Sequence, residues 1–284
     1  MLLHIAVGDA YGAGFEFCSR EKIVSGNTLE KYLPHELGIL AGQYTDDTQM
    51  SIAIAEVLLS NAGLSADVFA EAFVKSYRRD MRSGYARGLQ GLLDICESGA
   101  ELRRRIAPES RRNGAAMRSV PLGLIADKAL LAEAARQQAM VTHNTAEGML
   151  SSHVIALMSH VLLYDKASLS DLPEIIFTAT GFALRDDWCN EVECDALQTL
   201  HAVNTALQGN RSMSTLLLAC VNFGGDVDSV AAIAMGLASL TPEYVVDIPA
   251  SLVNGLESGE FGQNYLRQLD TALARRYPVL LAHL

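Results

Sequence analysis

Apolar residues recur at three- and four-residue steps along most of this chain, the spacing that buries one face of an α-helix. Behind Ser65, whose hydroxyl can cap a helix start, the pattern runs from Val68 to Tyr77. The same spacing predicts helices over residues 48–60, 127–140, 145–164, 172–182, 190–207, 213–221, 229–240 and 262–276. Alternating patterns typical of strands are nearly absent, and the best candidate is the short segment EYVVDI. The pattern therefore predicts an all-α fold.

The opening segment, AVGDAYGAGFEF, is unusual for a helix because it carries Gly8, Gly12 and Gly14. Each glycine in a helix interior costs about 1 kcal/mol relative to alanine, and is tolerated where another backbone or a ligand comes close. A helix that continued through the segment would place Asp9 and Glu16 on one face. The simpler interpretation, which this segment alone favours, is a helix that ends near Gly12 with both acids in solvent.

One domain, spanning residues 1–284, accounts for the whole chain. Half of the residues are hydrophobic and only 19% are charged, so the chain can bury a large core. Only seven prolines are present, and no linker rich in proline, glycine and serine divides the sequence.

The formal net charge of −11 argues against binding to a nucleic-acid backbone, which requires a basic surface. No apolar run approaches the roughly 18 residues of a membrane span. The start, MLLHIAV, has neither the basic lead nor the cleavage pattern of a signal peptide. The five cysteines are odd in number, lack CxxC spacing and indicate reduced thiols. These features predict a cytoplasmic protein without a membrane partner.

Oxygen-bearing side chains crowd two helix starts that lie far apart in the chain. In YTDDTQMSIAIAEVLL the crowded residues precede an apolar run; they are Thr45, Asp46 and Asp47. In NFGGDVDSVAAIAMGLASL they follow two glycines; they are Asp226, Asp228 and Ser229. Helix capping explains either cluster taken alone, but one cap uses one side chain.

A shared metal site explains both clusters together. Carboxylates that converge in a buried region repel one another and lose hydration unless a cation neutralises them. Oxygen ligands without His or Cys select magnesium, manganese or calcium over zinc, and the spacing is not that of an EF-hand loop. Four acids and two hydroxyls suit two adjacent ions, typically about 3.5–4 Å apart. His153 and His160 lie on an apolar helix, where we expect core or surface residues, not ligands.

The segment ELRRRIAPESRRNGAAMRSVPLGL carries six arginines between Arg103 and Arg118. Such a run is usually a solvated face. The alternative is an anion site, because the small residues and the Asn-Gly turn expose backbone N–H groups that bind phosphate. His143 could donate to the same anion, and Gly84 and Gly88 would let a ligand approach the backbone. A phosphate site beside two metals would suit a nucleotide-like substrate.

Five motifs resemble those of the ADP-ribosylglycohydrolase family in order and rough spacing. They are GDAYGAGFE, YTDDTQM, NGAAMRSVPLG, THNTAEG and GGDVDSVAAIA. The likeness runs from about Leu3 to at least Pro249. The resemblance implies a single-domain, all-α, orthogonal multi-helix bundle with a binuclear magnesium or manganese centre. It also implies hydrolysis of the bond between ADP-ribose and a modified acceptor.

Carried over motif by motif, the resemblance implies roles for individual residues. The metal ligands would be Thr45, Asp46, Asp47, Asp226, Asp228 and Ser229. The substrate-binding residues, around the diphosphate and distal ribose, would be Gly88, Ser110, Arg112, Asn113, Gly114 and His143. Glu16 would lie at the metal edge as a gating or acid/base carboxylate. We take Glu16, Asp46 and Asp226 as the catalytic residues nearest the scissile bond.

The chain departs from the family pattern in two motifs. The second metal motif commonly reads GGDTDT, whereas here Val227 and Ser229 replace two threonines. Serine keeps a hydroxyl ligand, and residue 227 would point away from the ions. The diphosphate loop usually has glycine before Asn-Gly, where this chain has Arg112.

The sequence therefore predicts a metal-dependent hydrolase that removes ADP-ribose from a modified acceptor, an ADP-ribosylated protein or a small conjugate. ADP-ribosyl-arginine is the expected linkage; serine, a nucleobase and an acetyl ester stay open, as do the choice of magnesium or manganese and the oligomeric state. Two other functions also stay open. One is a non-catalytic ADP-ribose-binding or crystallin-like protein, and the other is a metal-dependent phosphoesterase or pyrophosphatase.

Overall fold

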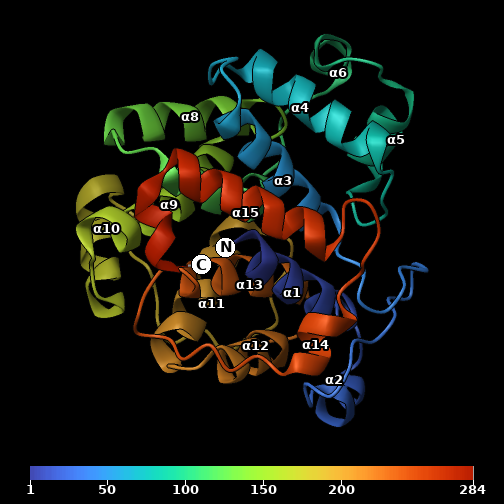
Figure 1. Cartoon of the computed structure of the whole chain (residues 1–284), viewed down its shortest axis with the longest axis vertical. Helices are drawn as coiled ribbons and strands as arrows, with labels where there is room; N and C mark the ends of the chain where they lie inside the picture. Colours follow the sequence, from blue (N-terminus) through green and yellow to red (C-terminus); the bar gives the residue numbers. More distant parts are fainter. Residues whose placement is uncertain (284) are drawn as a thin grey trace.

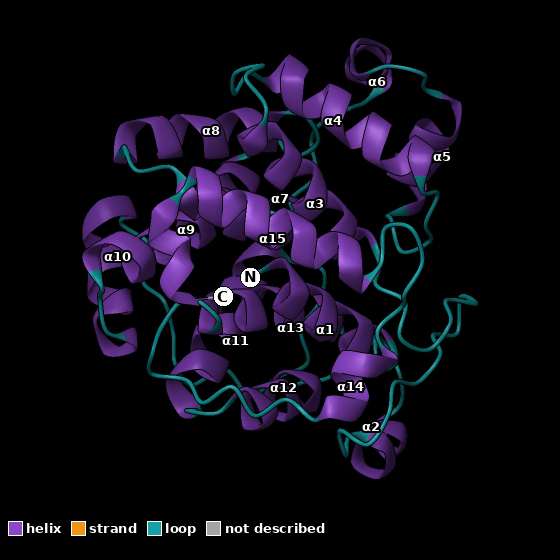
Figure 2. Ribbon diagram, in the orientation of Figure 1, coloured by secondary structure: helices purple, strands orange, loops and turns teal. Residues whose placement is uncertain are grey.

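The computed structural model describes residues 1–283, which form an all-α fold (Figures 1 and 2). The α-helices are α1 (Leu2–Ala13), α2 (Arg20–Gly26), α3 (Asp46–Leu59), α4 (Ala66–Arg79), α5 (Arg87–Ile95), α6 (Gly99–Arg105), α7 (Gly114–Met117), α8 (Lys128–Met140), α9 (Ala146–His160), α10 (Leu172–Thr180), α11 (Ala196–Gly209), α12 (Met213–Asn222), α13 (Val227–Ala238), α14 (Ala250–Gly255) and α15 (Gln263–Arg276). Shorter 3-10 or π segments are η1 (Val120–Leu124), η2 (Val161–Asp165), η3 (Leu169–Asp171) and η4 (Pro278–His283). The predicted fold class is confirmed.

Helices α1 and α13 form the centre of the molecule and lie against each other along their length (Figure 1). Glycines make this close approach possible. A Cβ added at Gly8 would lie 2.4 Å from the carbonyl oxygen of Ala231, and one at Gly12 would lie 2.4 Å from Asp228 Cα. Around this pair, α3 and α15 pack against α1, while α11 and α12 pack against α13. The glycine pattern therefore sets how close the N-terminal segment comes to the start of α13.

The first helix ends at Ala13, close to the expected end near Gly12. The expectation that its acids lie in solvent is wrong for Asp9, which is fully buried. Glu16 follows the end of the helix and is only partly exposed. The reason is the packing on the start of α3, where Thr45 and Thr48 donate hydrogen bonds to the Asp9 carboxylate.

Most predicted helices match observed helices within a few residues, but the start of α11 does not. The prediction began this helix at residue 190, whereas it begins at Ala196. Asp195 caps it by accepting hydrogen bonds from the N–H groups of Leu197 and Gln198. The preceding residues form a loop instead, and the backbone of Val192 bonds with Gly224 and with Asp226. This loop thus brings Cys194 to the cavity described below.

The predicted strand EYVVDI does not form a sheet. Among the described residues, backbone pairing of the β type occurs only as four isolated bridges, and Val245 of this segment contributes one of them with Ser212.

Helix α9 and η2 together run over Ala146–Asp165, which is 20 residues. This stretch is long and apolar enough to cross a membrane, contrary to the expectation that no run approaches that length. However, 72% of its apolar window is buried inside the protein. His160 on this helix is buried and bonds with the carbonyl oxygen of Ile125, as expected for a core histidine. These features are typical of a core helix.

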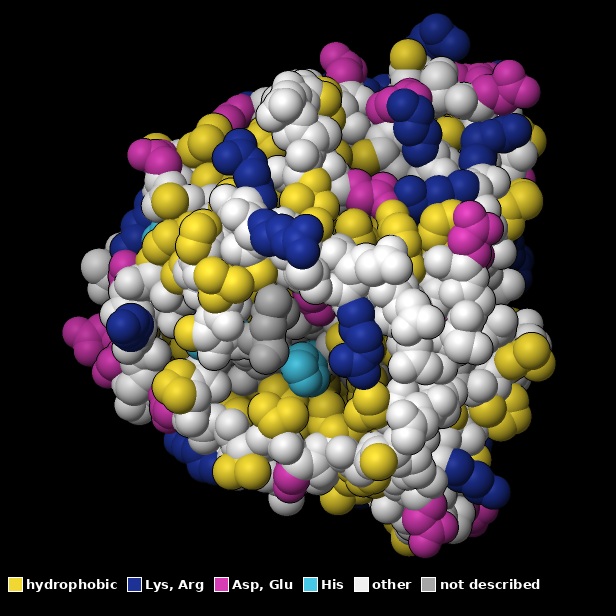
Figure 3. Space-filling view, in the orientation of Figure 1, with side chains coloured by type: hydrophobic (Ala, Val, Ile, Leu, Met, Phe, Trp, Pro, Cys, Tyr) yellow, Lys and Arg dark blue, Asp and Glu magenta, His cyan; other side chains and the backbone are white. Residues whose placement is uncertain are grey.

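Charged side chains of both signs are interspersed on the face seen in Figure 3, including the region of α4, α5 and α6. The first three arginines of the basic run lie on α6 and are exposed. Arg103 pairs with Asp67, and Arg105 pairs with Glu101. The solvated-face interpretation is therefore confirmed for this half of the run.

Candidate metal centre and substrate cavity

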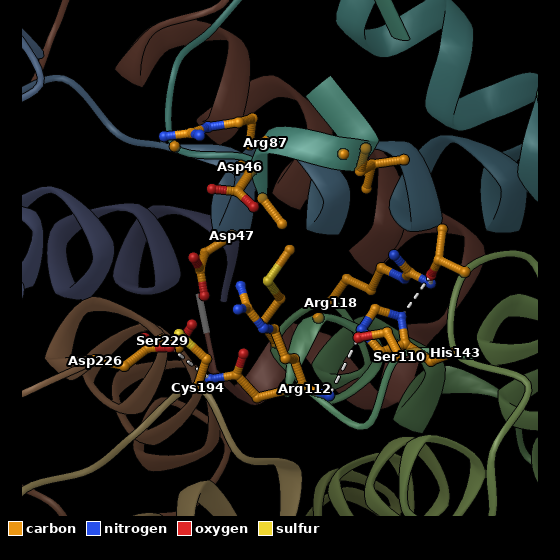
Figure 4. Close-up of a pocket in the computed structure, with 18 of the residues that line it drawn as sticks. Asp46, Asp47, Arg87, Ser110, Arg112, Arg118, His143, Cys194, Asp226 and Ser229 are labelled. Atoms are coloured by element: carbon orange, nitrogen blue, oxygen red, sulfur yellow. Dashed lines mark hydrogen bonds between the residues drawn. The ribbon is translucent and has the colours of Figure 1, made fainter. Parts of the chain in front are cut away.

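A cavity of about 660 Å³ opens beside the start of α13. The acidic residues from the two predicted clusters line one side, and the second half of the arginine-rich segment lines the other (Figure 4). Figure 4 shows Asp47, Asp226 and Ser229 on the acidic side, with Ser110 and His143 across the cavity. The volume lies in the range of small-molecule sites, about 300–1,000 Å³.

Two acidic triads converge at the acidic side. Carboxylate oxygens of Asp9, Asp47 and Asp228 lie within 4.8 Å of one another, and so do those of Glu16, Asp226 and Asp228. Asp228 therefore belongs to both triads. Asp46 lines the same cavity but belongs to neither triad. The convergence of the two distant acidic clusters is the geometry that a binuclear site requires.

Asp9 explains the crowding of hydroxyls in front of α3. Its carboxylate accepts hydrogen bonds from the Thr45 hydroxyl at 2.8 Å and the Thr48 hydroxyl at 2.6 Å. It also accepts from the backbone N–H groups of the same two residues, at 2.9 and 3.0 Å. Asp9 thus caps α3 from another helix, and the Thr45 hydroxyl is engaged with it. Asp9 was not among the predicted site residues; its position between Gly8 and Gly12 was the available signal.

The carboxylates on the acidic side of the cavity lack enough positively charged partners to balance their charge. Asp47 Oδ1 is buried and has no hydrogen-bond donor among the described residues. Burial, followed by the neighbouring carboxylates, raises the pKa of Asp46, Asp47 and Asp228 well above the usual aspartate range. Burial also raises the pKa of Asp9 to about 6, although the bonds from its threonines act in the opposite direction. A hard divalent cation would supply the missing charge and satisfy the orphaned oxygen. The residues therefore fit a metal centre.

Asp226 is held in place by the glycine turn before α13. Gly225 has φ +84°, and a Cβ there would lie 2.0 Å from the carbonyl oxygen of Val192, so this position requires glycine. The N–H of Asp226 donates to the same carbonyl at 2.7 Å. Its carboxylate accepts from Asn113 Nδ2 at 3.2 Å and lies close to the thiol of Cys194. Residue 227 was expected to point away from the ions, and Val227 is buried in the core and does not line the cavity.

Glu16 reaches the acidic side from a strained turn. Phe17 adopts φ +45°, which is uncommon outside glycine, and its N–H donates to the carbonyl oxygen of Gly225 at 2.9 Å. This bond ties the turn to the glycine segment before α13. Glu16 Oε2 lies 2.8 Å from His35 Nε2. The metal-edge position implied for Glu16 agrees with its place in the second triad.

The opposite side of the cavity is built by the segment 110–114. Ser110 Oγ accepts from the N–H of Arg112 at 3.2 Å, and Arg112 lines the cavity while remaining exposed. Asn113 is buried, and its N–H donates to the carbonyl oxygen of Cys194. Gly114 lies against the ring of His143, since a Cβ there would be 2.7 Å from His143 Cε1. The four predicted substrate residues of this segment and His143 are therefore brought together at one wall.

His143 is a neutral donor in this arrangement. Arg118 Nη2 donates to Thr142 Oγ1 at 2.8 Å, and Thr142 Oγ1 lies 2.6 Å from His143 Nδ1. When Thr142 donates its proton to Nδ1, the imidazole proton is on Nε2. Burial, followed by the charges of Arg118 and Arg112, lowers the pKa of His143 to about 3. Nε2 can thus donate to an anion without a charge of its own.

Arg118 is a residue of this site that sequence reasoning missed. It is fully buried, makes no ion pair with a described residue, and lies 4.3 Å above the ring of Phe73. It bonds with the side chain and the carbonyl oxygen of Gln138, and burial lowers its pKa to about 9. The isolated buried cation adds positive potential to the wall that carries His143. Nothing in the sequence distinguished Arg118 from the exposed arginines.

Gly84 and Gly88 both line the cavity. Gly84 has φ +117°, and a Cβ there would lie 2.6 Å from Asp46 Oδ1. Gly88, near the start of α5, has open space around it, with nothing within 4 Å of an added Cβ. Its surroundings leave room for a ligand, which is the role the resemblance implied.

Comparisons with known proteins agree on one family. The family model for ADP-ribosylglycohydrolase matches residues 1–280. The chain is 26% identical to ADP-ribosylarginine hydrolase Tri1 of Serratia proteamaculans, over 94% of this chain and 77% of that protein. It is 27% identical to ADP-ribosyl-[dinitrogen reductase] glycohydrolase of Rhodospirillum rubrum, over 96% of this chain and 94% of that protein.

A solved structure described as an ADP-ribosylglycohydrolase-related protein complex has the same fold. It superposes with a TM-score of 0.77 at 23% identity, and covers 98% of this chain and 96% of that chain.

Proposed function

Because the chain belongs to the ADP-ribosylglycohydrolase family and is a glycohydrolase, we propose that it releases ADP-ribose from ADP-ribosylated arginine with the help of two divalent cations. The observation that carries the metal part of this proposal is the sharing of Asp228 by two acidic triads. The arginine linkage is supported by the names of relatives, among which ADP-ribosylarginine hydrolase is one.

The polarity of the cavity supports one orientation of the substrate. The diphosphate would lie at the wall formed by Ser110, Arg112 and His143, where positive charge and N–H donors gather. Leu92 and Ile106 also line the cavity and offer an apolar surface for the adenine ring. The distal ribose would then lie at the acidic side, with its bond to the acceptor near Glu16.

Two cations held by the triads would offset the repulsion among the carboxylates, bind the ribose hydroxyls and favour ionisation of a water molecule. The remaining roles fall to side chains of this protein. Cleavage at the anomeric carbon passes through an oxocarbenium-like state, and the negative potential of Asp46 and Asp226 would stabilise its positive charge. Glu16 would transfer the proton between water and the leaving group. Such acid/base catalysis typically contributes 10²–10⁴-fold.

A panel of linkage-defined substrates tests the proposal. We expect intact ADP-ribose to appear from ADP-ribosyl-arginine peptide in magnesium or manganese, and no release after chelation. Peptides with serine-linked ADP-ribose and O-acetyl-ADP-ribose serve as alternative substrates in the same assay. Preferential release from either alternative substrate would contradict the arginine linkage. AMP and ribose phosphate as products would identify a pyrophosphatase, and tight ADP-ribose binding without release would identify a non-catalytic binder.

Gly88→Ala is expected to weaken ADP-ribose binding by about tenfold without lowering the melting temperature. An added methyl group meets no protein atom within 4 Å, and alanine favours the helix by up to about 1 kcal/mol, but the methyl occupies cavity space. Calorimetric titration and thermal melts measure the two effects. Gly91→Ala is the matched control, because Gly91 lies on the same helix with equally open surroundings and does not line the cavity. Equal affinities of the two variants would remove Gly88 from the ligand site.

A further inference from the structure

His35 contacts the catalytic candidate Glu16 from a loop that carries none of the family motifs. The loop connects α2 to α3, and His35 Nε2 lies 2.8 Å from Glu16 Oε2. The His35 side chain is only 8% exposed and that of Glu16 only 20%, so water has little access to the pair. A close polar contact shielded in this way constrains geometry more than one on an open surface.

The hydrogen bonds assign the tautomer of His35. The N–H of Leu37 donates to His35 Nδ1 at 2.8 Å, so Nδ1 is an acceptor and carries no proton. In the neutral ring the proton is then on Nε2, the nitrogen that lies 2.8 Å from Glu16 Oε2. Nε2 of the neutral His35 ring is therefore the nitrogen that can donate to the Glu16 carboxylate, and the second oxygen of Glu16 remains free.

The backbone around His35 is itself fixed. Its N–H donates to the carbonyl oxygen of Ile39 at 3.0 Å, and its carbonyl oxygen accepts from the N–H of Gly38 at 3.1 Å. Gly38 adopts φ +84°, which closes the turn. Nearby, Leu33 lies against the segment that leads to Glu16, since a Cβ at Gly14 would be 2.7 Å from the Leu33 carbonyl oxygen. The loop and the Glu16 turn thus form one packed unit.

We propose that His35 is a positioning residue that holds the Glu16 carboxylate toward Asp226 and Asp228. Glutamate has three rotatable side-chain bonds, and fixing such a side chain opposes its conformational entropy. Small errors in the placement of a proton-transfer group reduce the rate strongly, by as much as about 100-fold for 1 Å. The catalytic part of this inference rests on the proposed function, whereas the contact between His35 and Glu16 does not.

Nitrogen NMR of the magnesium-loaded protein tests the hydrogen bond without an activity assay. We expect the His35 ring to show a protonated Nε2 and an unprotonated Nδ1, with the signal assigned by its loss in His35→Gln. In Glu16→Gln the Nε2 resonance is expected to shift, because its charged acceptor is replaced by an amide. A proton on Nδ1, or an Nε2 resonance indifferent to Glu16→Gln, would overturn the proposal.

Kinetics test the positioning role. We expect His35→Ala to lower kcat on ADP-ribosyl-arginine by about 10- to 100-fold with KM within about twofold. His35→Gln, whose amide can donate from nearly the position of Nε2, is expected to recover most of the rate. Leu40→Ala is the control, because this side chain lies on the same loop and is 66% exposed. Its kcat should equal that of the unmodified protein.

A double-mutant cycle with Glu16→Gln shows whether His35 acts through Glu16. If it does, His35→Ala has little further effect once Glu16 is replaced. Additive losses, or no recovery in His35→Gln, would contradict the positioning role. An unmodified protein that fails to hydrolyse ADP-ribosyl-arginine would overturn the proposed function instead, while the NMR result would still decide the Glu16–His35 pair.

Discussion

Asp228→Asn is expected to reduce hydrolysis on the order of 10³-fold or more and, at the same time, to raise the melting temperature of the metal-free protein. Asp228 is the carboxylate shared by both triads, so its loss weakens both candidate ion sites at once. Electrostatic groups placed at a reacting centre contribute effects of this size. Initial rates with saturating magnesium and circular dichroism measure the loss of activity and the retention of the fold.

The expected rise in the melting temperature of Asp228→Asn follows from the removal of repulsion between carboxylates. Burial and the nearby acids Glu16, Asp226 and Asp47 raise the pKa of Asp228, so its ionised form is disfavoured in the folded protein. Asparagine has nearly the same shape and no charge, and removes this repulsion when no metal is present. Asp186→Asn, on an exposed aspartate outside the cavity, is the matched control and should change neither quantity. Near-normal turnover of Asp228→Asn would refute the shared-ligand interpretation.

The melting temperature of the chelated protein is expected to fall by about 5 °C or more between pH 5 and pH 8. The folded-state pKa values of Asp9, Asp46, Asp47 and Asp228 are raised, to about 6 for Asp9, whereas unfolded aspartate has a pKa of about 3.9. Between these values the folded state binds more protons than the unfolded state. The free energy of unfolding therefore decreases as pH rises above about 4.

Magnesium is expected to reverse this dependence. Metal ions compete with protons for the carboxylates and bind the folded state, so the gain in melting temperature should be larger at pH 8 than at pH 5. Thermal melts with chelator and with magnesium measure both curves. Potassium chloride at equal ionic strength is the control for charge screening. A flat pH dependence in chelator, or equal effects of both salts, would show that the carboxylates do not form a metal centre.

Helical periodicity was enough to predict the fold class, because the apolar stripes at three- and four-residue steps are local. It failed at residues 190–195, where backbone bonds to the glycine turn before α13 compete with the helix. It also failed at EYVVDI, where a β-like composition has no neighbouring strand to pair with. In both cases the deciding contact comes from residues distant in the sequence.

The residues of the candidate site also fall into two groups: some could be predicted from the local sequence, and others depend on contacts between distant segments. The clusters around Asp46 and Asp226 were visible because each exceeds what a helix cap requires. Asp9 was not assigned, because its role depends on α1 lying against α13 and on its bonds to the threonines of α3. Arg118 and His35 were also missed. Arg118 resembles its exposed arginine neighbours in sequence, and His35 lies in a loop whose structure cannot be predicted from periodicity.

The close contact between α1 and α13 at Gly8 and Gly12 has a consequence for protein engineering. Exchange of glycine for alanine is a common way to stiffen a helix, but at Gly8 and Gly12 the methyl group would wedge the two central helices apart. The same displacement would carry Asp9 away from Asp228, so heat resistance and activity would be lost together. Substitutions intended to raise the thermal stability should therefore avoid Gly8 and Gly12 and begin at open positions such as Gly91.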